Sequence, residues 1–488
     1  MPSAFVLAIP IPAFAWMLLR GFRLTSILIG SLAAVALFPG PASAASSIAT
    51  GIAEPTLTDP RPDVRDTWFD NVQHVRAQLD RVNVNWSATT GNNRPADPTD
   101  PADPAYGWTA IDREVREAAD RGLDILFLLN PAPRWAEGNN RPDREQAGSW
   151  KPDPEAFGKF GIALATRYSG SYPDPEGGTL PHVDLYEAFN EPNLDFWLSP
   201  QYEGDKNTGP GLYRDLNNSL AHGVKSVDPS NKIVGPALAP FGGRTEARKT
   251  RTRPMKFIRD VFCLKGRKRP KPTSCPGGER LILDIVSHHP ISVTGPPNQK
   301  AVNPNDATAG DMPEIRKATR TAEKGNKLLP TGIRRPIWVT EYWWRTKPRS
   351  PDGVPPKKQA RWVEQSLYIF WKAGVKMAIY NTLRDPQFQP ELSFGLYWRD
   401  GKAKPSATAF RFPFVANRKS KRKLGIWGQS PATGKLTVQR KKGKHWKTVK
   451  RINAQEGKVF KATVKLKSKQ TLRATVDGEK SLAWEQKG

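Results

Sequence analysis

A chain of 488 residues with 38% hydrophobic residues and 16 tryptophans can bury one large core and a smaller one, so a disordered or fibrous protein is excluded. The net charge is +28, and residues 415–488 hold 21 Lys and Arg against four acidic residues. Such a field attracts polyanions such as nucleic acid, acidic polysaccharide or an anionic cell wall. The alternative is a basic surface without a specific partner.

The N-terminus has the features of a secretory signal. Arg20 and Arg23 precede an apolar run over 24–38, and small residues follow up to Ala44. This order predicts a signal peptide over 1–44 and a secreted protein, extracellular or associated with the cell wall. A membrane anchor is the alternative, but the run is shorter than the roughly 20 apolar residues that span a bilayer. No other run is long enough, so we expect no transmembrane segment in the mature chain.

Residues 45–414 alternate short apolar runs with longer segments of helical periodicity, as repeated β-α units do. The expected strands are 48–52, 79–84, 123–129, 183–189, 232–234, 281–286, 337–340 and 376–381. Amphipathic helices are expected around 111–119, 157–168, 212–224 and 362–370. Eight alternations favour a closed (β/α)8 TIM barrel over an open doubly wound sheet, which usually carries a Gly-rich phosphate turn after its first strand.

Cys263 and Cys275 are the two cysteines of the chain, and they flank a basic segment. An even number of cysteines in an exported protein favours a disulfide, so we expect one bond that closes this loop. With so few soft ligands and no zinc-motif spacing, no metal site is expected.

Residues 415–488 change to an alternating pattern, as in 435–439 and 460–466. A period of two with Lys on one side predicts a small antiparallel β domain with one solvated face. We expect this basic accessory domain to hold the protein near an anionic glycan by electrostatic attraction.

Two glutamates stand where apolar strands end. One strand ends in Asn190-Glu191-Pro192, and another ends in Glu341, beside aromatic residues. The C-terminal ends of strands meet at the mouth of a β/α barrel, where barrel enzymes build their sites. Hydrolysis of an acetal with retention needs two carboxyl groups about 5 Å apart, one to protonate the leaving oxygen and one to attack the anomeric carbon. Either glutamate alone would be read as an ordinary ion-pair partner, whereas the pair points to this chemistry.

The two strand ends resemble those of the retaining glycoside hydrolases of clan A, especially families 39 and 5, and the similarity covers about 48–412. The resemblance implies that Glu191 is the general acid/base and Glu341 the nucleophile. It also implies that Asn190 hydrogen-bonds the 2-hydroxyl of the sugar. The corresponding double-displacement mechanism needs neither a metal nor a cofactor.

Further residues match the same families one at a time. Arg81 resembles the second-strand arginine that steadies the nucleophile, although it could be an ordinary buried ion-pair partner. His289 resembles the histidine of a sixth-strand His-Pro-Tyr element, with His288 as the competing candidate. The sequence departs from the pattern at Ile291, where a tyrosine usually reaches the nucleophile, and at Tyr380, where a tryptophan often lies under the sugar.

Several aromatic residues at or after strand ends are candidates for stacking on sugars, with core packing as the alternative. They are Trp86, Trp135, Trp197, Trp343 and Trp344. Glu187 lies an even number of residues before Glu191, so both side chains should point to the same side of the strand. We expect Glu187 to be structural and paired with Arg81.

These features predict a secreted retaining β-glycosidase that acts on a poly- or oligosaccharide, with endo and exo action both open. The alternative is a non-catalytic protein that binds glycan or cell wall through a degenerate barrel and a cationic tethering domain. A nucleic-acid partner is not expected, because few aromatic residues are interleaved with the basic ones and the protein is exported. We expect a monomer.

Overall fold

The computed structural model describes residues 47–242, 250–292, 295–387, 389, 391–466 and 470–486. The expected signal peptide, 1–44, lies outside these residues. Among the described residues, no helix has both the length and the apolar composition needed to cross a membrane.

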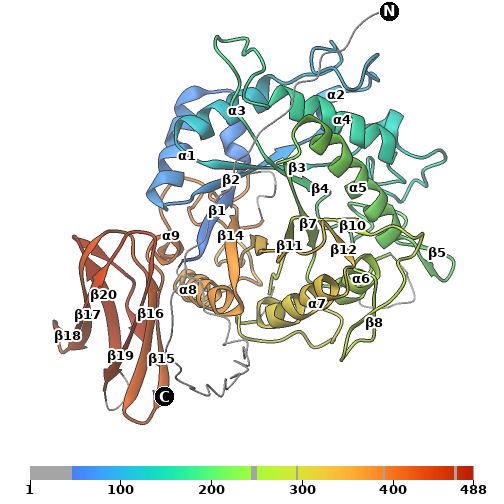
Figure 1. Ribbon diagram of the computed structural model, residues 1–488. Helices are drawn as coiled ribbons and strands as arrows, with labels where there is room; N and C mark the ends of the chain where they lie inside the picture. Colours follow the sequence, from blue (N-terminus) through green and yellow to red (C-terminus); the bar gives the residue numbers. More distant parts are fainter. Residues whose placement is uncertain are drawn as a thin grey trace, which may run out of the picture. The chain divides into compact units, whose positions relative to one another are not determined.

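Eight parallel strands form a closed barrel, which confirms the (β/α)8 prediction (Figure 1). In chain order they are β1 (Ala49–Ala53), β2 (Leu79–Val84), β3 (Asp124–Leu129), β4 (Leu185–Ala188), β7 (Lys232–Leu238), β11 (Ile285–His288), β13 (Ile337–Tyr342) and β14 (Val375–Asn381). The ring closes where β1 pairs with both β14 and β2. The polar ends of all eight strands therefore meet at one mouth.

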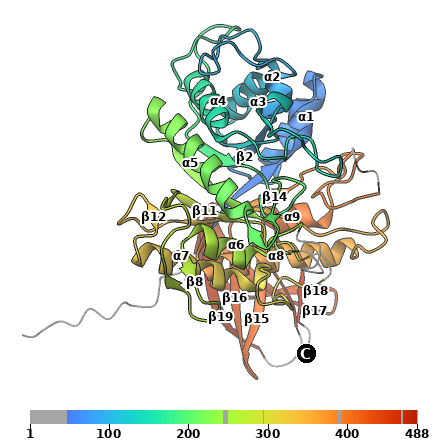
Figure 2. The same cartoon turned by 90° about the vertical axis from the view of Figure 1, so that its right-hand side faces the viewer.

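A helix follows each barrel strand, and the helices surround the barrel in Figures 1 and 2. They are α1 (Pro62–His74), α3 (Thr109–Asp120), α4 (Pro154–Arg167), α5 (Gly209–Val227), α6 (Pro254–Val261), α7 (Met312–Lys324), α8 (Pro356–Ala373) and α9 (Pro405–Arg411), with the short α2 (Trp86–Thr90) after β2. The four helices expected from periodicity are α3, α4, α5 and α8. Their apolar stripes pack against the outside of the barrel, as the spacing requires.

The barrel interior is filled by one apolar layer below the mouth. It consists of Leu79, Leu126, Leu185, Val234, Ile285, Met377 and Ile379. Gly51 on β1 meets this layer so closely that a Cβ atom there would lie 2.9 Å from the carbonyl oxygen of Leu79. The packed layer closes the barrel from below, so a ligand can enter only from the polar end.

The sixth barrel strand was predicted too early in the chain. The apolar run 281–286 splits into a two-residue strand, β10 (Leu281–Ile282), and the barrel strand β11. β10 pairs with β12 (Leu328–Leu329) outside the barrel, and Asp284 then accepts a hydrogen bond from the backbone N–H of Ile233. One apolar run therefore serves two sheets, which periodicity alone does not reveal.

The disulfide between Cys263 and Cys275 is present, as predicted. It spans the short hairpin of β8 (Leu264–Lys265) and β9 (Lys271–Pro272), which follows α6. The bond thus fixes an excursion on the outside of the barrel rather than a part of the mouth.

Antiparallel strands follow from residue 414, at the lower left of Figure 1. One sheet contains β15 (Phe414–Ser420), β16 (Lys423–Gln429) and β19 (Val459–Lys465). The other contains β17 (Gly434–Lys442), β18 (His445–Ala454), β20 (Thr471–Val476), β21 (Glu479–Lys480) and β22 (Trp484–Glu485). Buried side chains of both sheets, such as Leu424 and Leu436, share one apolar core. The all-β character expected for this region is confirmed.

Aromatic side chains join these sheets to the barrel. The ring of Trp427 on β16 lies 5.4 Å from that of Tyr368 and 5.7 Å from that of Trp371, both on α8. The guanidinium carbon of Arg361, also on α8, lies 3.3 Å from the ring centre of Trp484. Each sheet packs one face in the shared core. The opposite face of the three-stranded sheet contacts α8, whereas the opposite face of the other sheet is exposed to solvent.

Candidate active site

Glu191 reaches the barrel mouth through an unusual turn after β4. The strand ends at Ala188, and Phe189 and Glu191 have positive φ angles of 55° and 41°. Non-glycine residues adopt this conformation at a cost of roughly 1–3 kcal/mol each, so the surrounding structure must impose it. The backbone N–H of Glu191 donates to the carbonyl of Ala237 on β7, whose φ is also positive, at 49°. The strained turn after β4 and the strained end of β7 thus hold each other, and they aim Glu191 inward.

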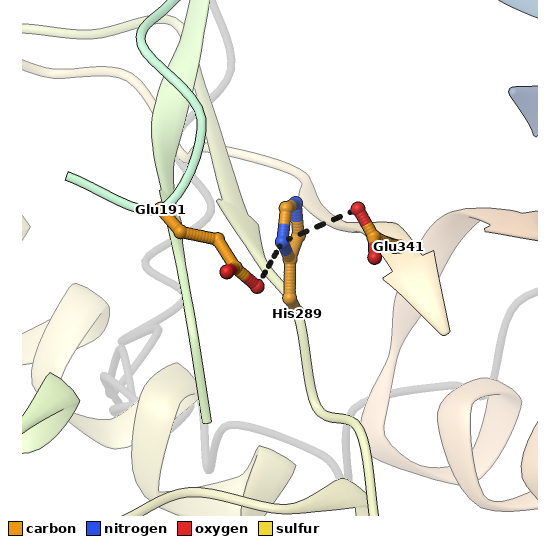
Figure 3. A group of neighbouring side chains, drawn as sticks. All are labelled: Glu191, His289 and Glu341. Atoms are coloured by element: carbon orange, nitrogen blue, oxygen red, sulfur yellow. Dashed lines mark hydrogen bonds and ion pairs between the residues drawn. The ribbon is translucent and has the colours of Figure 1, made fainter. Parts of the chain in front are cut away.

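His289 lies between the two glutamates (Figure 3). Its Nδ1 is 3.0 Å from Oε1 of Glu191 and 3.8 Å from Oε2 of Glu341. One oxygen of each glutamate and this nitrogen all lie within 4.8 Å of one another. The two glutamate oxygens are therefore at most 4.8 Å apart, which fits the roughly 5 Å between the carboxyl groups of retaining glycosidases better than the roughly 6.5–9.5 Å that inverting ones need for a water molecule. Among the described residues, this is also the group whose ligand atoms could share a cation.

Burial gives Glu191 the properties of an acid. It raises the pKa of this carboxyl to about 7, although Arg81 and a hydrogen bond with Trp197 act in the opposite direction. Burial also lowers the pKa of His289 to about 4, so the imidazole is neutral at pH 7. A proton on the Glu191–His289 pair therefore belongs mainly to the carboxyl group below pH 7.

Glu341 lies in surroundings that stabilise a negative charge. The indole Nε1 of Trp343 donates to its Oε1 at 2.9 Å. A guanidinium nitrogen of Arg81 lies 3.8 Å from its Oε2. The two side chains are exposed to a similar extent, 14% for Glu191 and 12% for Glu341, so the indole donor and the guanidinium next to its Oε2 are what distinguish Glu341. Different surroundings are how a pair of carboxyl groups takes two roles.

Arg81 connects the interior of the barrel to the mouth. It donates from Nε to Oε2 of Glu187 at 2.8 Å and from Nη2 to Oδ1 of Asn190 at 3.1 Å. Ser287 donates to the other oxygen of Glu187 at 2.7 Å, so both oxygens of this fully buried carboxylate are paired. The expected structural role of Glu187 and its pairing with Arg81 are therefore observed. Arg81 is held by Glu187 and in turn orients Asn190.

A cavity of about 630 Å³ opens over these residues. Its polar walls come from strand ends around the mouth: Glu54, Arg81, Asn83, Asn130, Asn190, Glu191, Glu341, Arg345 and Asn381. Its apolar and aromatic walls include Leu128, Trp197, Trp343, Leu392 and Phe394. The Trp343 ring stacks on Phe394 with centroids 4.8 Å apart. Flat apolar surfaces beside amides and carboxyl groups suit a sugar ring with its hydroxyls.

Four of the predicted aromatic contact residues lie away from this cavity: Trp86, Trp135, Trp344 and Tyr380. Trp86 is fully buried and stacks on Phe160, because it begins α2 and points behind the strands. Trp135 packs against Trp86 and is covered by Arg94. The fully buried Tyr380 donates its hydroxyl to the carbonyl of Phe394. These side chains support the cavity from behind and form none of its described walls.

The two histidines take separate positions. His289 joins the glutamates, whereas the Nε2 of His288 lies 2.8 Å from the carbonyl oxygen of Ala307. Both rings are fully buried. Ile291, in place of the usual tyrosine, is buried and outside the cavity walls. The indole of Trp343 supplies the hydrogen bond to Glu341 instead.

Three buried carboxyl groups beside the mouth are not predicted by the sequence patterns. Glu54 follows β1 and Glu114 lies on α3, and both line the cavity. Asp80 on β2 is fully buried, and neither of its oxygens has a hydrogen-bond partner among the described residues. Burial raises the pKa of all three, that of Asp80 to about 8. Neighbouring carboxyl groups raise the pKa of Asp80 and Glu114 further, whereas hydrogen bonds from Arg384 and Thr56 partly offset the rise at Glu54.

A signal for two of them was available. Glu54 precedes Pro55 after an apolar strand, which is the same pattern as Glu191 and Pro192. Glu114 interrupts the buried stripe of α3, one turn after Ile111 and beside Val115. A charged residue on the buried side of a helix is a candidate for a site.

Comparisons with protein-family models and with curated proteins give no match. Solved structures do match. A family 39 glycoside hydrolase from the gut symbiont Bacteroides cellulosilyticus WH2 has a TM-score of 0.53 and 15% identity, over 86% of this chain and 81% of that one. A monomeric beta-xylosidase from Caulobacter crescentus CB15 has a TM-score of 0.49 and 16% identity, over 87% and 96% of the chains. A glucosidase from Croceicoccus marinus has a TM-score of 0.46 and 17% identity, over 84% and 81%.

The fold resembles that of a family 39 enzyme. At 15% identity this similarity concerns the fold, and it agrees with the resemblance that the two strand-end motifs indicated. The activity of the chain has to be argued from its own side chains.

Proposed function

We propose that the protein is a secreted, monomeric retaining β-glycosidase that cleaves a glycan at the barrel mouth. The observation that carries the proposal is the pair Glu191 and Glu341. Their nearest oxygens lie within 4.8 Å, and their environments differ as acid and nucleophile require. Family 39 enzymes share the barrel, which supports the same conclusion.

In the first step, Glu341 attacks the anomeric carbon while Glu191 gives its proton to the leaving oxygen. Trp343 and Arg81 hold the Glu341 carboxylate in position by the contacts at 2.9 and 3.8 Å. The neutral His289 beside Glu191 leaves the proton on the carboxyl group. The step forms a glycosyl ester on Glu341 and releases the aglycone as an alcohol.

In the second step, the Glu191 carboxylate takes a proton from water, which attacks the anomeric carbon and releases Glu341. Asn190, oriented by Arg81, donates to the sugar hydroxyl next to the reacting carbon. Both steps use carboxyl groups of the chain for proton transfer and covalent bonding, so the proposal invokes no metal or cofactor.

The test measures release of sugar from a panel of β-linked aryl glycosides and soluble polysaccharides by the wild type, Glu191→Gln and Glu341→Gln. We expect both variants to lose several orders of magnitude in kcat. Azide should rescue Glu191→Gln alone, on a substrate with a good leaving group, because it replaces water on an intact glycosyl ester. The product should be the β-glycosyl azide.

A panel without any cleaved substrate, together with retained glycan binding, would contradict hydrolysis and favour the alternative of a glycan-binding barrel. An α-configured azide product from Glu191→Gln would contradict retention. Thermal unfolding of each variant, compared with the wild type, separates loss of chemistry from loss of fold.

A further inference from the structure

The sheet that contains β17, β18 and β20 has one buried and one exposed face. Leu436, Val438, Leu472 and Ala474 are fully buried in the core between the two sheets. Side chains alternate along a strand, so the residues between them project to the other side. The cations and the aromatic residue on this side define the outer face: Lys435, Lys441, Trp446, Arg451, Arg473 and Lys480.

Little negative charge opposes these cations. Glu485 shares the outer face, at the edge where β22 pairs with β20. Glu456 and Glu479 form ion pairs with arginines of the barrel region instead. Asp477 lies in the turn between β20 and β21. The outer face therefore keeps a strong positive potential, which a polyanion can complement.

Arg473 is held in a fixed orientation at the centre of the outer face. Its guanidinium carbon lies 4.1 Å from the ring centre of Trp446, a cation–π contact. Its Nε donates to Oε1 of Gln439 at 2.9 Å. Among the described residues, neither Nη atom has a hydrogen-bond acceptor. The Nη edge of the guanidinium is thus free and already oriented.

A planar fork of two N–H donors matches a carboxylate, which it binds with two parallel hydrogen bonds. Arg473 lies opposite Gln439. Lys441, opposite Trp446, is one outward-facing row away on one side, and Arg451, opposite Thr437, is one row away on the other. Rows on one face of a strand are about 7 Å apart. The cations therefore form a track rather than a point, as a ligand with repeated negative charges requires.

We infer that the outer face binds a polysaccharide with carboxylate groups, as uronate residues carry. Arg473 binds one carboxylate, and Lys441 and Arg451 attract the carboxylates of the adjacent sugar residues. Single-stranded nucleic acid fits less well, because its binding sites stack several bases on free aromatic rings and here Arg473 covers the single indole. The inference is independent of the proposed hydrolysis, since binding is measured without turnover.

The experiment measures binding of the mature protein to soluble polygalacturonate at low salt, in the Glu341→Gln background so that the polymer stays intact. Arg473→Lys keeps the charge and removes the fork, and we expect affinity to fall about tenfold or more. Trp446→Leu should have a similar effect, because it removes the ring that holds the Arg473 guanidinium in its orientation. Dextran, a neutral polymer, should not bind.

A matched pair of double variants separates this face from general positive charge. Lys441→Ala/Arg451→Ala removes two cations of the outer face. Lys423→Ala/Lys465→Ala removes two exposed cations that face each other across β16 and β19 in the other sheet. We expect the first pair to weaken binding at least tenfold and the second less than threefold.

Equal losses in both double variants, or an unchanged affinity in Arg473→Lys, would overturn the inference. Tighter binding of double-stranded DNA or of dextran sulfate than of polygalacturonate would overturn the choice of a carboxylated polymer. Melting temperatures equal to that of the parent show that each variant is folded.

Discussion

Four glutamates, Glu54, Glu114, Glu191 and Glu341, line the cavity at the barrel mouth, whereas five Lys and Arg side chains project from the outer face. The charges at the mouth are buried, and most have an individual partner or a raised pKa. The charges of the outer face are exposed, except for the half-buried Arg473, and they act together. The same chain thus uses charge in two ways.

The difference lies in the dielectric surroundings. At the mouth, low dielectric makes single contacts strong enough to set protonation states, as burial does for Glu191. On the outer face, water and salt weaken each charge, so only the sum of many attracts a ligand. A cavity rich in carboxyl groups suits a neutral sugar, while the outer face suits an anionic chain. The two regions therefore need not recognise the same sugar residue.

Apart from the two reacting glutamates, the largest effect is expected from Arg81, because it contacts both sides of the mouth. Replacement by Met should lower kcat/KM about 10²–10³-fold, since Glu341 loses its cation and Asn190 its orienting donor. The measurement is steady-state hydrolysis of an aryl glycoside.

The control addresses the buried charge left on Glu187. The double variant Arg81→Met/Glu187→Gln removes this charge together with Arg81, so it should recover thermal stability without recovering activity. If activity returns with stability, Arg81 only neutralises Glu187 and has no part in positioning the reacting groups.

The second effect is a pH dependence at the mouth. The pKa of Glu191 is raised to about 7, so its acid form is lost as pH rises through that value. On a substrate with a poor leaving group, kcat/KM should fall about tenfold for each pH unit above this point. The fall should be absent in Glu191→Gln on a substrate that needs no acid. A fall centred near the ordinary glutamate pKa would contradict the assignment.

The sequence predicted the parts of this mouth that depend on local pattern. Apolar strands that end in a carboxyl group identified Glu191 and Glu341. Outside the mouth, the alternation of polar and apolar residues identified the antiparallel sheets of residues 415–488. The sequence could not place Trp86, because the direction of a side chain after a strand depends on the turn that follows. It could not place Tyr380, because only the structure shows that Met377 and Ile379 of β14 face the barrel interior and Tyr380 therefore its outside. It also missed Asp80, whose burial beside Glu54 and Glu114 depends on how β2 packs with its neighbours. The residues that share the outer face could not be predicted either, because they depend on the register between strands, which the alternation within one strand does not specify.

The third effect tests the buried carboxyl group that lies behind the mouth. Asp80 has a raised pKa of about 8, so it favours the folded state at low pH, and this contribution is lost as pH rises from about 4 to 8. Asp80→Asn has no such dependence. Relative to the wild type, the variant should gain roughly 1–3 kcal/mol in unfolding free energy between pH 4 and pH 8.

The side-chain amide of Asp80→Asn is buried without partners, which lowers the free energy of unfolding by the same amount at both pH values. This cost cancels when the change in unfolding free energy between the two pH values is compared for each protein. Urea unfolding at both pH values gives the difference. Parallel stability curves for the two proteins would show that Asp80 is ionised or paired in the folded state, in contradiction to its two unpartnered oxygens.

The smallest effect is expected at the mouth itself when salt is added. Because its charges are buried and paired at short range, about 0.3 M NaCl should change kcat/KM on a small neutral aryl glycoside less than twofold. Binding of polygalacturonate to the outer face should weaken progressively over the same range, with a slope that reflects the number of cations engaged. Equal salt dependence of both would mean that the small glycoside also meets the exposed field, and the two regions would then act as one electrostatic surface.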